Sequence, residues 1–183
     1  MKVREVHDII IEKYPYHESL NKRLMEDMKS MNFFTPNENL FFTNIRARQF
    51  NFNKDNPAPE TVKTIVKWVE NLIRAQCSDW FDIQKYGHAG EKYSIDIATA
   101  NWIALYNKGE ETWKHDHKQC LLGYVYFVHS PPGSSPLVFS TTGKKVKPEE
   151  GTVVVFPGTV SHHVPKNNCD GRITLAGNIT FEL

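Results

Sequence analysis

The sequence predicts an α+β fold, mainly β, in which N-terminal helices brace one face of a sheet sandwich. Apolar residues recur at helical spacing in the first half of the chain, whereas short alternating segments separated by Gly and Pro fill the second half. This order of elements favours helices that pack against one side of a sheet. No internal repeat or break in composition divides the chain, so we expect a single domain over residues 1–183. Helices and loops over 1–92 should pack on a jelly-roll core over 93–183.

Two amphipathic helices are expected in the first half. The first covers residues 17–31, where four apolar side chains recur at helical spacing, namely Leu20, Leu24, Met28 and Met31. The second begins near Pro59, which suits the first helical turn because no N–H is needed there. Its apolar stripe consists of Val62, Ile65, Val66, Val69, Leu72 and Ile73. Residues 1–14 form either an edge strand or a short lead-in, and residues 32–59 form a loop with one or two short strands, for instance at 41–44.

The second half of the chain contains the predicted strands. One long strand or two short ones cover residues 93–106, and further strands are expected at 120–128, 136–140, 152–156 and 172–182. The last strand has two unlike faces. Its apolar face, which we expect to pack against helices or a second sheet, consists of Ile173, Leu175, Gly177, Ile179 and Phe181. Its other face, which would line the mouth of a cavity in a barrel-like sandwich, consists of Arg172, Thr174, Ala176, Asn178 and Thr180.

The composition is that of an ordinary soluble globular protein, with 40% hydrophobic and 23% charged residues. The net charge of +1 gives no electrostatic case for binding nucleic acid or a membrane surface. No apolar run approaches the roughly 20 residues that a membrane helix needs, and the N-terminus lacks the pattern of a signal peptide. Three cysteines without CxxC spacing (Cys77, Cys120 and Cys169) fit free thiols in a reducing compartment. We therefore expect a cytoplasmic protein, and a homodimer is compatible with the sequence.

A pair of histidines marks the candidate functional site. If the segment around His115 and His117 is extended, both imidazoles point to the same side and Asp116 points to the other. A third imidazole is available from His162, which follows a predicted strand and a Phe-Pro-Gly turn. Ligands from an early and a late strand can meet only if the sheet closes on itself, as in jelly rolls and cupins. The sequence therefore predicts a metal site inside a cupin-like jelly roll.

Several alternatives remain open at this site. An isolated HxH is more often a polar patch, here beside Lys114 and Lys118. His163 competes with His162 for the third position, because neighbours in an extended segment point to opposite sides. A bulge that reversed the alternation would let Asp116 replace one imidazole; otherwise Asp116 would orient a neighbouring ring. Three imidazoles with open coordination positions suit Fe(II), but also Zn, Ni or Cu.

Arg172 is the candidate anchor for an organic acid. Its guanidinium matches a carboxylate in a planar, bidentate geometry, and Thr174 could add a hydroxyl to the same carboxylate. The competing interpretation is a strand-end arginine paired with an acid such as Asp170. Tyr124 and Tyr126 share one face of their strand, and although strand aromatics are mostly core residues, one hydroxyl could reach a co-substrate.

Several sequence segments together resemble a known family, in the same order and with similar spacing. They are Trp102 to Gly109, His115-Asp116-His117, Gly123-Tyr124-Val125-Tyr126-Phe127-Val128, Gly151 to Phe156-Pro157 with His162, and Gly171-Arg172-Ile173-Thr174 followed by Asn178. The chain resembles, over residues 100–181, the small 2-oxoglutarate/Fe(II)-dependent oxygenase-like proteins found in bacteria and their phages.

The resemblance implies a double-stranded β-helix with Fe(II) held at His115, His117 and His162 and with 2-oxoglutarate chelating the metal. Arg172 would hold the far carboxylate of 2-oxoglutarate together with Thr174, and Tyr124, Tyr126 and Asn178 are further candidates for contacts with it. The implied activity is a dioxygenase that couples oxidative decarboxylation of 2-oxoglutarate to hydroxylation of an unidentified small-molecule or protein substrate. The chain departs from the usual family pattern in two ways, since a His replaces the common Asp or Glu ligand and His163 stands where an aromatic residue is commoner.

Two other functions compete with this one. The first is a three-His cupin-type metalloenzyme that does not use 2-oxoglutarate, in which Arg172 would bind a carboxylate of the substrate itself. The second is a non-catalytic jelly-roll module for binding or structure, in which the histidines have no catalytic role.

Overall fold

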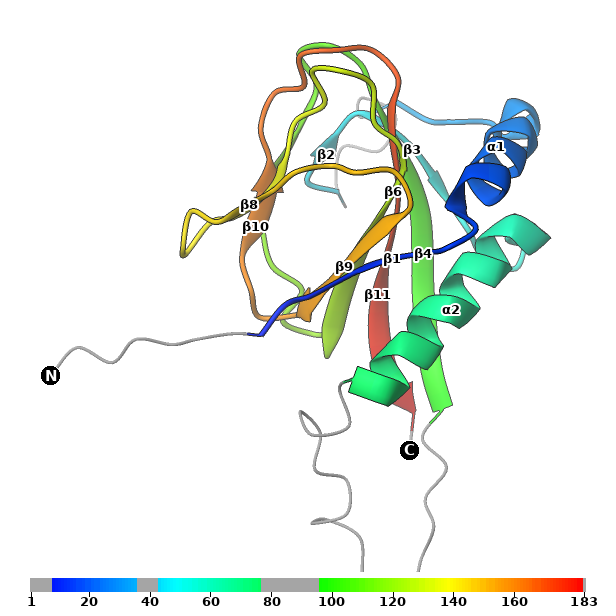
Figure 1. Ribbon diagram of the computed structural model, residues 1–183, viewed down its shortest axis with the longest axis vertical. Helices are drawn as coiled ribbons and strands as arrows, with labels where there is room; N and C mark the ends of the chain where they lie inside the picture. The colour runs from blue at the N-terminus through cyan, green and yellow to red at the C-terminus, as the bar shows by residue number, and fades with distance from the viewer. Residues whose placement is uncertain (1–7, 36–42, 77–95, 183) are drawn as a thin grey trace, which may run out of the picture.

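Two antiparallel sheets face each other, and two helices cover the outer side of the larger one (Figure 1). The computed structural model describes residues 8–35, 43–76 and 96–182. The first elements are β1 (Ile10–Lys13), α1 (His17–Asp27), η1 (Met28–Ser30), β2 (Ile45–Arg46), β3 (Arg48–Asn51) and α2 (Glu60–Gln76). The second half contributes β4 (Asp96–Tyr106), β5 (Glu111–His115), β6 (Leu122–His129), β7 (Leu137–Phe139), β8 (Lys145–Val146), β9 (Thr152–Pro157), β10 (His162–Val164) and β11 (Arg172–Glu182).

The strands from β4 onward alternate between the two sheets. The larger sheet has the order β1-β9-β6-β11-β4-β3, and the smaller has the order β2-β5-β10-β7-β8. The chain therefore crosses from one sheet to the other after β4, β5, β6, β8, β9 and β10, as in a jelly roll. The prediction of a mainly β, α+β fold is confirmed.

Both helices lie where the sequence places them. In α2 the buried apolar residues are Val62, Ile65, Val66, Val69 and Ile73, and Leu72 packs partly buried beside them. In α1 the buried Asn21 is also structural, because its Nδ2 donates to Val128 O at 2.7 Å and its Oδ1 accepts from the Tyr126 hydroxyl at 2.8 Å. These two hydrogen bonds link α1 to β6.

The N-terminal half contributes strands as well as helices. β1 pairs with β9, β2 with β5, and β3 with β4, so each sheet gains strands from residues before 52. The expected strand at 41–44 is wrong in its described part, because Thr43 and Asn44 are not strand residues and β2 begins at Ile45. β2 is hard to predict from the sequence because one of its two residues is the charged Arg46. Its guanidinium packs on an indole ring, with Cζ 3.7 Å from the centroid of Trp113.

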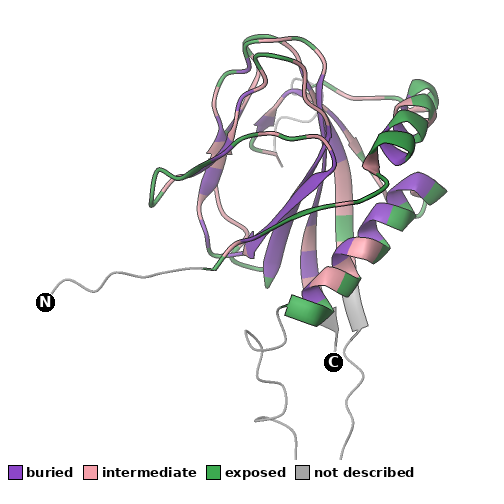
Figure 2. Ribbon diagram, viewed as in Figure 1, coloured by how far each residue is buried: buried purple, intermediate pink, exposed green. Residues whose placement is uncertain are grey.

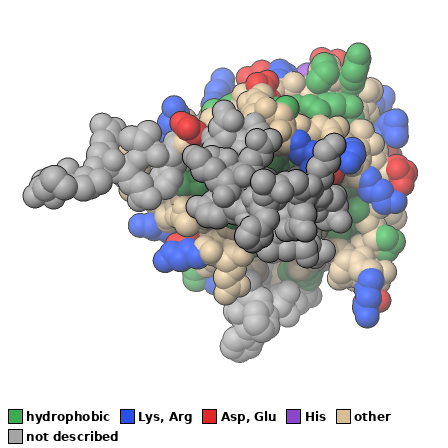
Figure 3. All heavy atoms as spheres, turned by 90° about the horizontal axis from the view of Figure 1, so that it is seen from below, with side chains coloured by type: hydrophobic (Ala, Val, Ile, Leu, Met, Phe, Trp, Pro, Cys, Tyr) green, Lys and Arg blue, Asp and Glu red, His purple; other side chains and the backbone are tan. Residues whose placement is uncertain are grey.

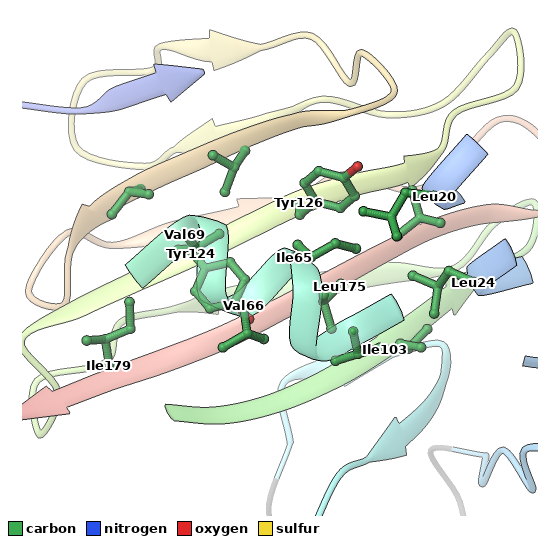
Figure 4. Close-up of a cluster of buried hydrophobic side chains, with 14 of the residues drawn as sticks. Leu20, Leu24, Ile65, Val66, Val69, Ile103, Tyr124, Tyr126, Leu175 and Ile179 are labelled. Carbon is green, nitrogen blue, oxygen red and sulfur yellow. The ribbon is translucent and has the colours of Figure 1, made fainter. Parts of the chain in front are cut away.

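Two apolar cores lie on the two faces of the larger sheet. The core between this sheet and the helices includes Leu20, Leu24, Ile65, Val69, Tyr124 and Leu175 (Figure 4). The core between the two sheets includes Phe127, Leu137, Phe139, Val154, Phe156 and Val164. The central strands β6 and β9 are buried on both faces as a result (Figure 2). In β11, Ile173, Leu175 and Ile179 join the helix-side core, which leaves the alternate residues facing the second sheet.

The surface carries both signs of charge. Lys, Arg, Asp and Glu side chains are interspersed around the end of the molecule shown in Figure 3. Within the described residues, no helix is long and apolar enough to cross a membrane.

Candidate metal centre

Three imidazoles converge between the sheets. The donor nitrogens of His115, His117 and His162 all lie within 4.8 Å of one another, and the ring centroids are 4.3 to 5.1 Å apart. Nitrogens bound at about 2.1 Å to one ion lie about 3 Å apart, so the rings need to close by only about 1–2 Å around a metal. The arrangement is that of three facing ligands with open positions toward the cavity.

A bulge in β5 brings His115 to the inner face. His162 pairs with His115 and Val164 pairs with Thr112, so three steps along β5 match two steps along β10. The extra residue lets Thr112 and His115 face the same cavity although they are three positions apart, an offset that would put them on opposite faces of a regular strand. β5 ends at His115, and His117 reaches the cluster from the segment that follows.

Two of the imidazoles have a fixed tautomer. His115 Nδ1 lies 2.8 Å from Trp113 O, and His162 Nδ1 lies 3.0 Å from Val160 O. A carbonyl oxygen can only accept, so each Nδ1 carries the proton and each Nε2 keeps its lone pair. In both cases the carbonyl belongs to the residue two positions earlier, and this contact aims Nε2 toward the metal position.

The environment keeps all three rings neutral. Burial lowers the pKa of His162 to about 3 and that of His117 to about 4, and the neighbouring His115 ring adds to both effects. Burial also lowers the pKa of His115. Neutral imidazoles bind metal ions and protonated ones do not, so the cluster offers three free lone pairs at physiological pH.

The metal-free protein should lose stability as the pH falls from about 6.5 toward 4. The unfolded imidazoles take up protons near the ordinary pKa of about 6.5, whereas the pKa values of folded His117 and His162 are about 4 and about 3. The unfolded state therefore binds more protons in this window, and the free energy of unfolding declines with falling pH. Urea denaturation at a series of pH values, with chelator present, measures the slope. A variant with all three histidines changed to Gln should show a shallower slope, and an unchanged slope would contradict this origin.

The structure separates the remaining candidate ligands from the cluster. The Asp116 carboxylate lies 3.6 Å from Lys118 Nζ and is not among the atoms that converge with the three rings. His163 faces the other side of β10, where its Nδ1 is 2.9 Å from the Ser140 hydroxyl. Asp116 and His163 thus lie outside the group of His115, His117 and His162.

Arg172 is buried in the same cavity without an anion. Its side chain is 0% exposed, and none of its three guanidinium nitrogens has a hydrogen-bond partner within the described part of the chain. Its Cζ lies over the ring face of Tyr106, 4.6 Å from the centroid, and the Tyr106 hydroxyl is instead bonded to Thr112 Oγ1 at 2.6 Å. The alternative pairing with Asp170 is not present, because Asp170 accepts from the backbone N–H of Lys108.

Burial lowers the pKa of Arg172, yet a guanidinium stays charged at neutral pH. An unpaired buried charge is costly, so this side chain calls for an anion inside the cavity.

The cavity connects this cation to the histidines. Besides Arg172 and the three histidines, its lining residues include Ala104, Val125, Leu137, Phe156, Val164 and Thr174. Thr174 is buried beside Arg172 on β11 and supplies a hydroxyl to the same space. One cavity with mostly apolar walls is therefore lined by both the three imidazoles and the Arg172 guanidinium.

The remaining predicted contact residues, Tyr126, Tyr124 and Asn178, differ in their position relative to this cavity. The Tyr126 hydroxyl faces α1, where it bonds Asn21, so Tyr126 is a residue of the helix-side core and not a ligand contact. Tyr124 borders the cavity, but its hydroxyl donates to Asn101 Oδ1 at 2.5 Å and its ring belongs to the same core. Asn178 is half-buried, and its Oδ1 has no hydrogen-bond partner among the residues that the structure describes. Thr112 and Phe156 line the cavity but were not predicted as cavity residues, since strand aromatics and threonines are common in any sheet.

Solved structures with a similar fold cover nearly the whole chain. A prolyl-4-hydroxylase from Pseudomonas putida matches with a TM-score of 0.69 and 15% identity, over 95% of this chain and 92% of that one. The viral collagen prolyl hydroxylase of Paramecium Bursaria Chlorella virus-1, in its 2OG complex, matches with a TM-score of 0.61 and 16% identity, over 94% and 96%. HygX from Streptomyces hygroscopicus, with nickel and 2-oxoglutarate bound, gives 0.62 and 7% identity, over 94% and 82%. No family model and no curated protein matches the sequence.

The protein is therefore a double-stranded β-helix protein. The solved proteins that share this fold with it include prolyl hydroxylases and a member of the 2OG-Fe(II) oxygenase family from Burkholderia pseudomallei.

Proposed function

We propose that the protein is an Fe(II)- and 2-oxoglutarate-dependent dioxygenase that hydroxylates an organic substrate. The observation that carries this proposal is Arg172, a fully buried guanidinium without a hydrogen-bond partner among the described residues, in the cavity that also holds three neutral imidazoles. The similar structures support it, since two of them contain 2-oxoglutarate and one of these also contains nickel.

The charge of the cavity fits 2-oxoglutarate. A divalent ion and Arg172 would bring three positive charges into it, and no carboxylate lies among its described lining residues. A dianion with one carboxylate at each end balances most of this charge and can bridge the two positive groups. Val125, Leu137 and Val164 would contact the methylene groups between the carboxylates.

Each described residue has a distinct task in this scheme. His115, His117 and His162 would hold Fe(II), while Arg172 and the Thr174 hydroxyl would hold the far carboxylate. The bound ion would supply the redox chemistry by which 2-oxoglutarate, O2 and a substrate C–H yield succinate, CO2 and C–OH. The buried walls exclude water from the reacting centre, and the fixed tautomers of His115 and His162 keep the two ligands oriented during turnover.

The similar structures suggest a class of substrate that should be tested first. Several of the similar structures are prolyl hydroxylases, and one of them, from Trichoplax adhaerens, contains a hypoxia inducible factor peptide (TM-score 0.65, 15% identity, over 94% of this chain and 83% of that one). Prolyl peptides are therefore the first candidates for the group that is hydroxylated.

Formation of succinate from 2-oxoglutarate without any added substrate is the direct test of this function. Fe(II) and 2-oxoglutarate under anaerobic conditions should give the weak visible charge-transfer band of a chelate, and adding O2 should then release succinate slowly. Arg172→Ala should remove the band at the same metal loading. Metal binding without a band, together with no effect of Arg172→Ala, would instead favour a three-His metalloenzyme that does not use 2-oxoglutarate. Absence of metal binding would favour a non-catalytic module.

A further inference from the structure

His117 is held through its backbone rather than through its ring. His115 and His162 each anchor Nδ1 on a carbonyl, but within the described part of the chain neither ring nitrogen of His117 has a hydrogen-bond partner. Its backbone N–H donates to Gly158 O at 2.7 Å, and its carbonyl accepts from Cys120 N–H at 2.8 Å. The position of this imidazole therefore depends on the turn formed by residues 117–120, here named the ligand turn.

Gly158 packs directly against the ligand turn. Its N–H donates to Leu121 O at 2.8 Å, so Gly158 is bonded to the chain at both ends of the turn. A Cβ atom at Gly158 would lie 2.1 Å from Cys120 O and 2.6 Å from His117 O. Both are backbone atoms that no side-chain rotation can move, so the ligand turn would have to retreat by about 1 Å or more to reach an ordinary contact distance.

Space, and not backbone conformation, is the reason for a glycine here. Gly158 is not one of the glycines with positive φ, which are Gly109, Gly133, Gly143, Gly151 and Gly171. An alanine at position 158 would therefore adopt the same backbone without intrinsic strain. The added methyl group would instead prevent the close approach between the end of β9 and the ligand turn.

We propose that Gly158 is a positioning residue for the metal centre, one that fixes the His117 imidazole by admitting the ligand turn to the end of β9. This inference rests on the proposed metal centre. Gly158 also lies four positions before His162, so one loop presents one ligand and sets the place of another. Gly123 borders the same imidazole, because a Cβ atom at Gly123 would lie 3.4 Å from His117 Cδ2.

A double-mutant cycle on cobalt binding tests this role. Co(II) titrated into the metal-free protein and followed by its absorption bands reports the affinity without any turnover. Gly158→Ala should weaken Co(II) binding by about 10- to 100-fold, the range typical of groups that orient a ligand. In a His117→Ala background the same substitution should cause no further loss, because the residue it positions is already gone.

Two matched variants separate positioning from general damage. Thr159→Ala changes the exposed neighbour in the same loop and should leave the Co(II) affinity unchanged. Gly151→Ala places a Cβ 2.2 Å from the His17 side chain, and neither residue lines the cavity, so it should lower the melting temperature of the metal-free protein without changing the affinity of the folded fraction.

If Gly158→Ala does not fold, one Gly inserted between the exposed Lys118 and Gln119 loosens the ligand turn without adding an atom to the core. The same loss of Co(II) affinity, absent in the His117→Ala background, is expected. Equal losses with and without His117, or no loss in either variant, would overturn the positioning role. If instead His115→Ala and His162→Ala leave Co(II) binding intact, the metal centre itself is wrong, which is a different failure.

Discussion

Replacing His162 by alanine should lower the affinity for Fe(II) by more than about 100-fold and abolish the conversion of 2-oxoglutarate to succinate. Removing a ligand should cost more than removing the groups that orient one, which typically cost 10- to 100-fold. His162 is only 4% exposed and its Nδ1 is fixed by Val160 O, so this buried, oriented ligand is lost and two imidazoles remain. Metal content after dialysis and single-point succinate assays measure both effects.

Asp116→Asn is the matched control for this experiment. It removes the carboxylate nearest in sequence to the triad, but that carboxylate lies beside Lys118 and outside the group of three rings. Its effect on metal affinity should stay within about fivefold, since an exposed ion pair is worth about 0–1 kcal/mol. If Asp116→Asn abolishes metal binding and His117→Ala does not, the site is a two-His-one-carboxylate centre and the assignment of His117 is wrong.

Arg172→Met should have opposite effects on stability and on co-substrate binding. In the metal-free protein it replaces a buried, unpaired cation by an apolar side chain of similar length, so the free energy of unfolding should rise by about 1–3 kcal/mol. The contact of the guanidinium with the Tyr106 ring offsets part of this gain. The affinity for 2-oxoglutarate should fall by at least about 100-fold, because truncating one partner of a buried charge pair costs about 2–5 kcal/mol or more.

Denaturant melts of the metal-free protein and anaerobic titrations with 2-oxoglutarate measure the two effects of Arg172→Met separately. Arg46→Met is the control, because Arg46 lies on the partly exposed Trp113 and does not line the cavity. It should leave the affinity for 2-oxoglutarate unchanged. A loss of stability together with unchanged 2-oxoglutarate binding in Arg172→Met would show that the guanidinium is structural and does not hold the co-substrate.

Periodicity was sufficient to predict the helices and most long strands. The stripe in α2 and the two faces of β11 follow directly from spacings of 3.6 and 2 residues. The very short strands β2, β8 and β10 lie outside what periodicity can detect, because two or three residues contain only about one repeat of the two-residue strand pattern. Pairing with neighbouring strands, and not local preference, determines them.

The candidate site was predicted in outline and required the structure in detail. Strict alternation placed His115 and His117 on one side and Asp116 on the other, and the structure groups both imidazoles with His162 and leaves Asp116 outside that group, although β5 ends at His115. The bulge in β5 leaves no mark in the sequence that separates it from regular extension. The distinction between His162 and His163 likewise depends on register with β5 and β7, which only long-range pairing sets. The place of Tyr126 was misjudged because its partner Asn21 lies on a helix 105 residues away in sequence.

The distribution of the polar groups over two sheets has a consequence for selectivity. Two of the three imidazoles, His115 and His162, stand on the smaller sheet, whereas the guanidinium of Arg172 stands on the larger one. Under the proposed function, the distance between the two sheets would select the length of the dicarboxylate that can bridge them. Phe127, Phe139 and Phe156 pack in the core between the sheets, so these apolar residues would help to set that length without binding either carboxylate.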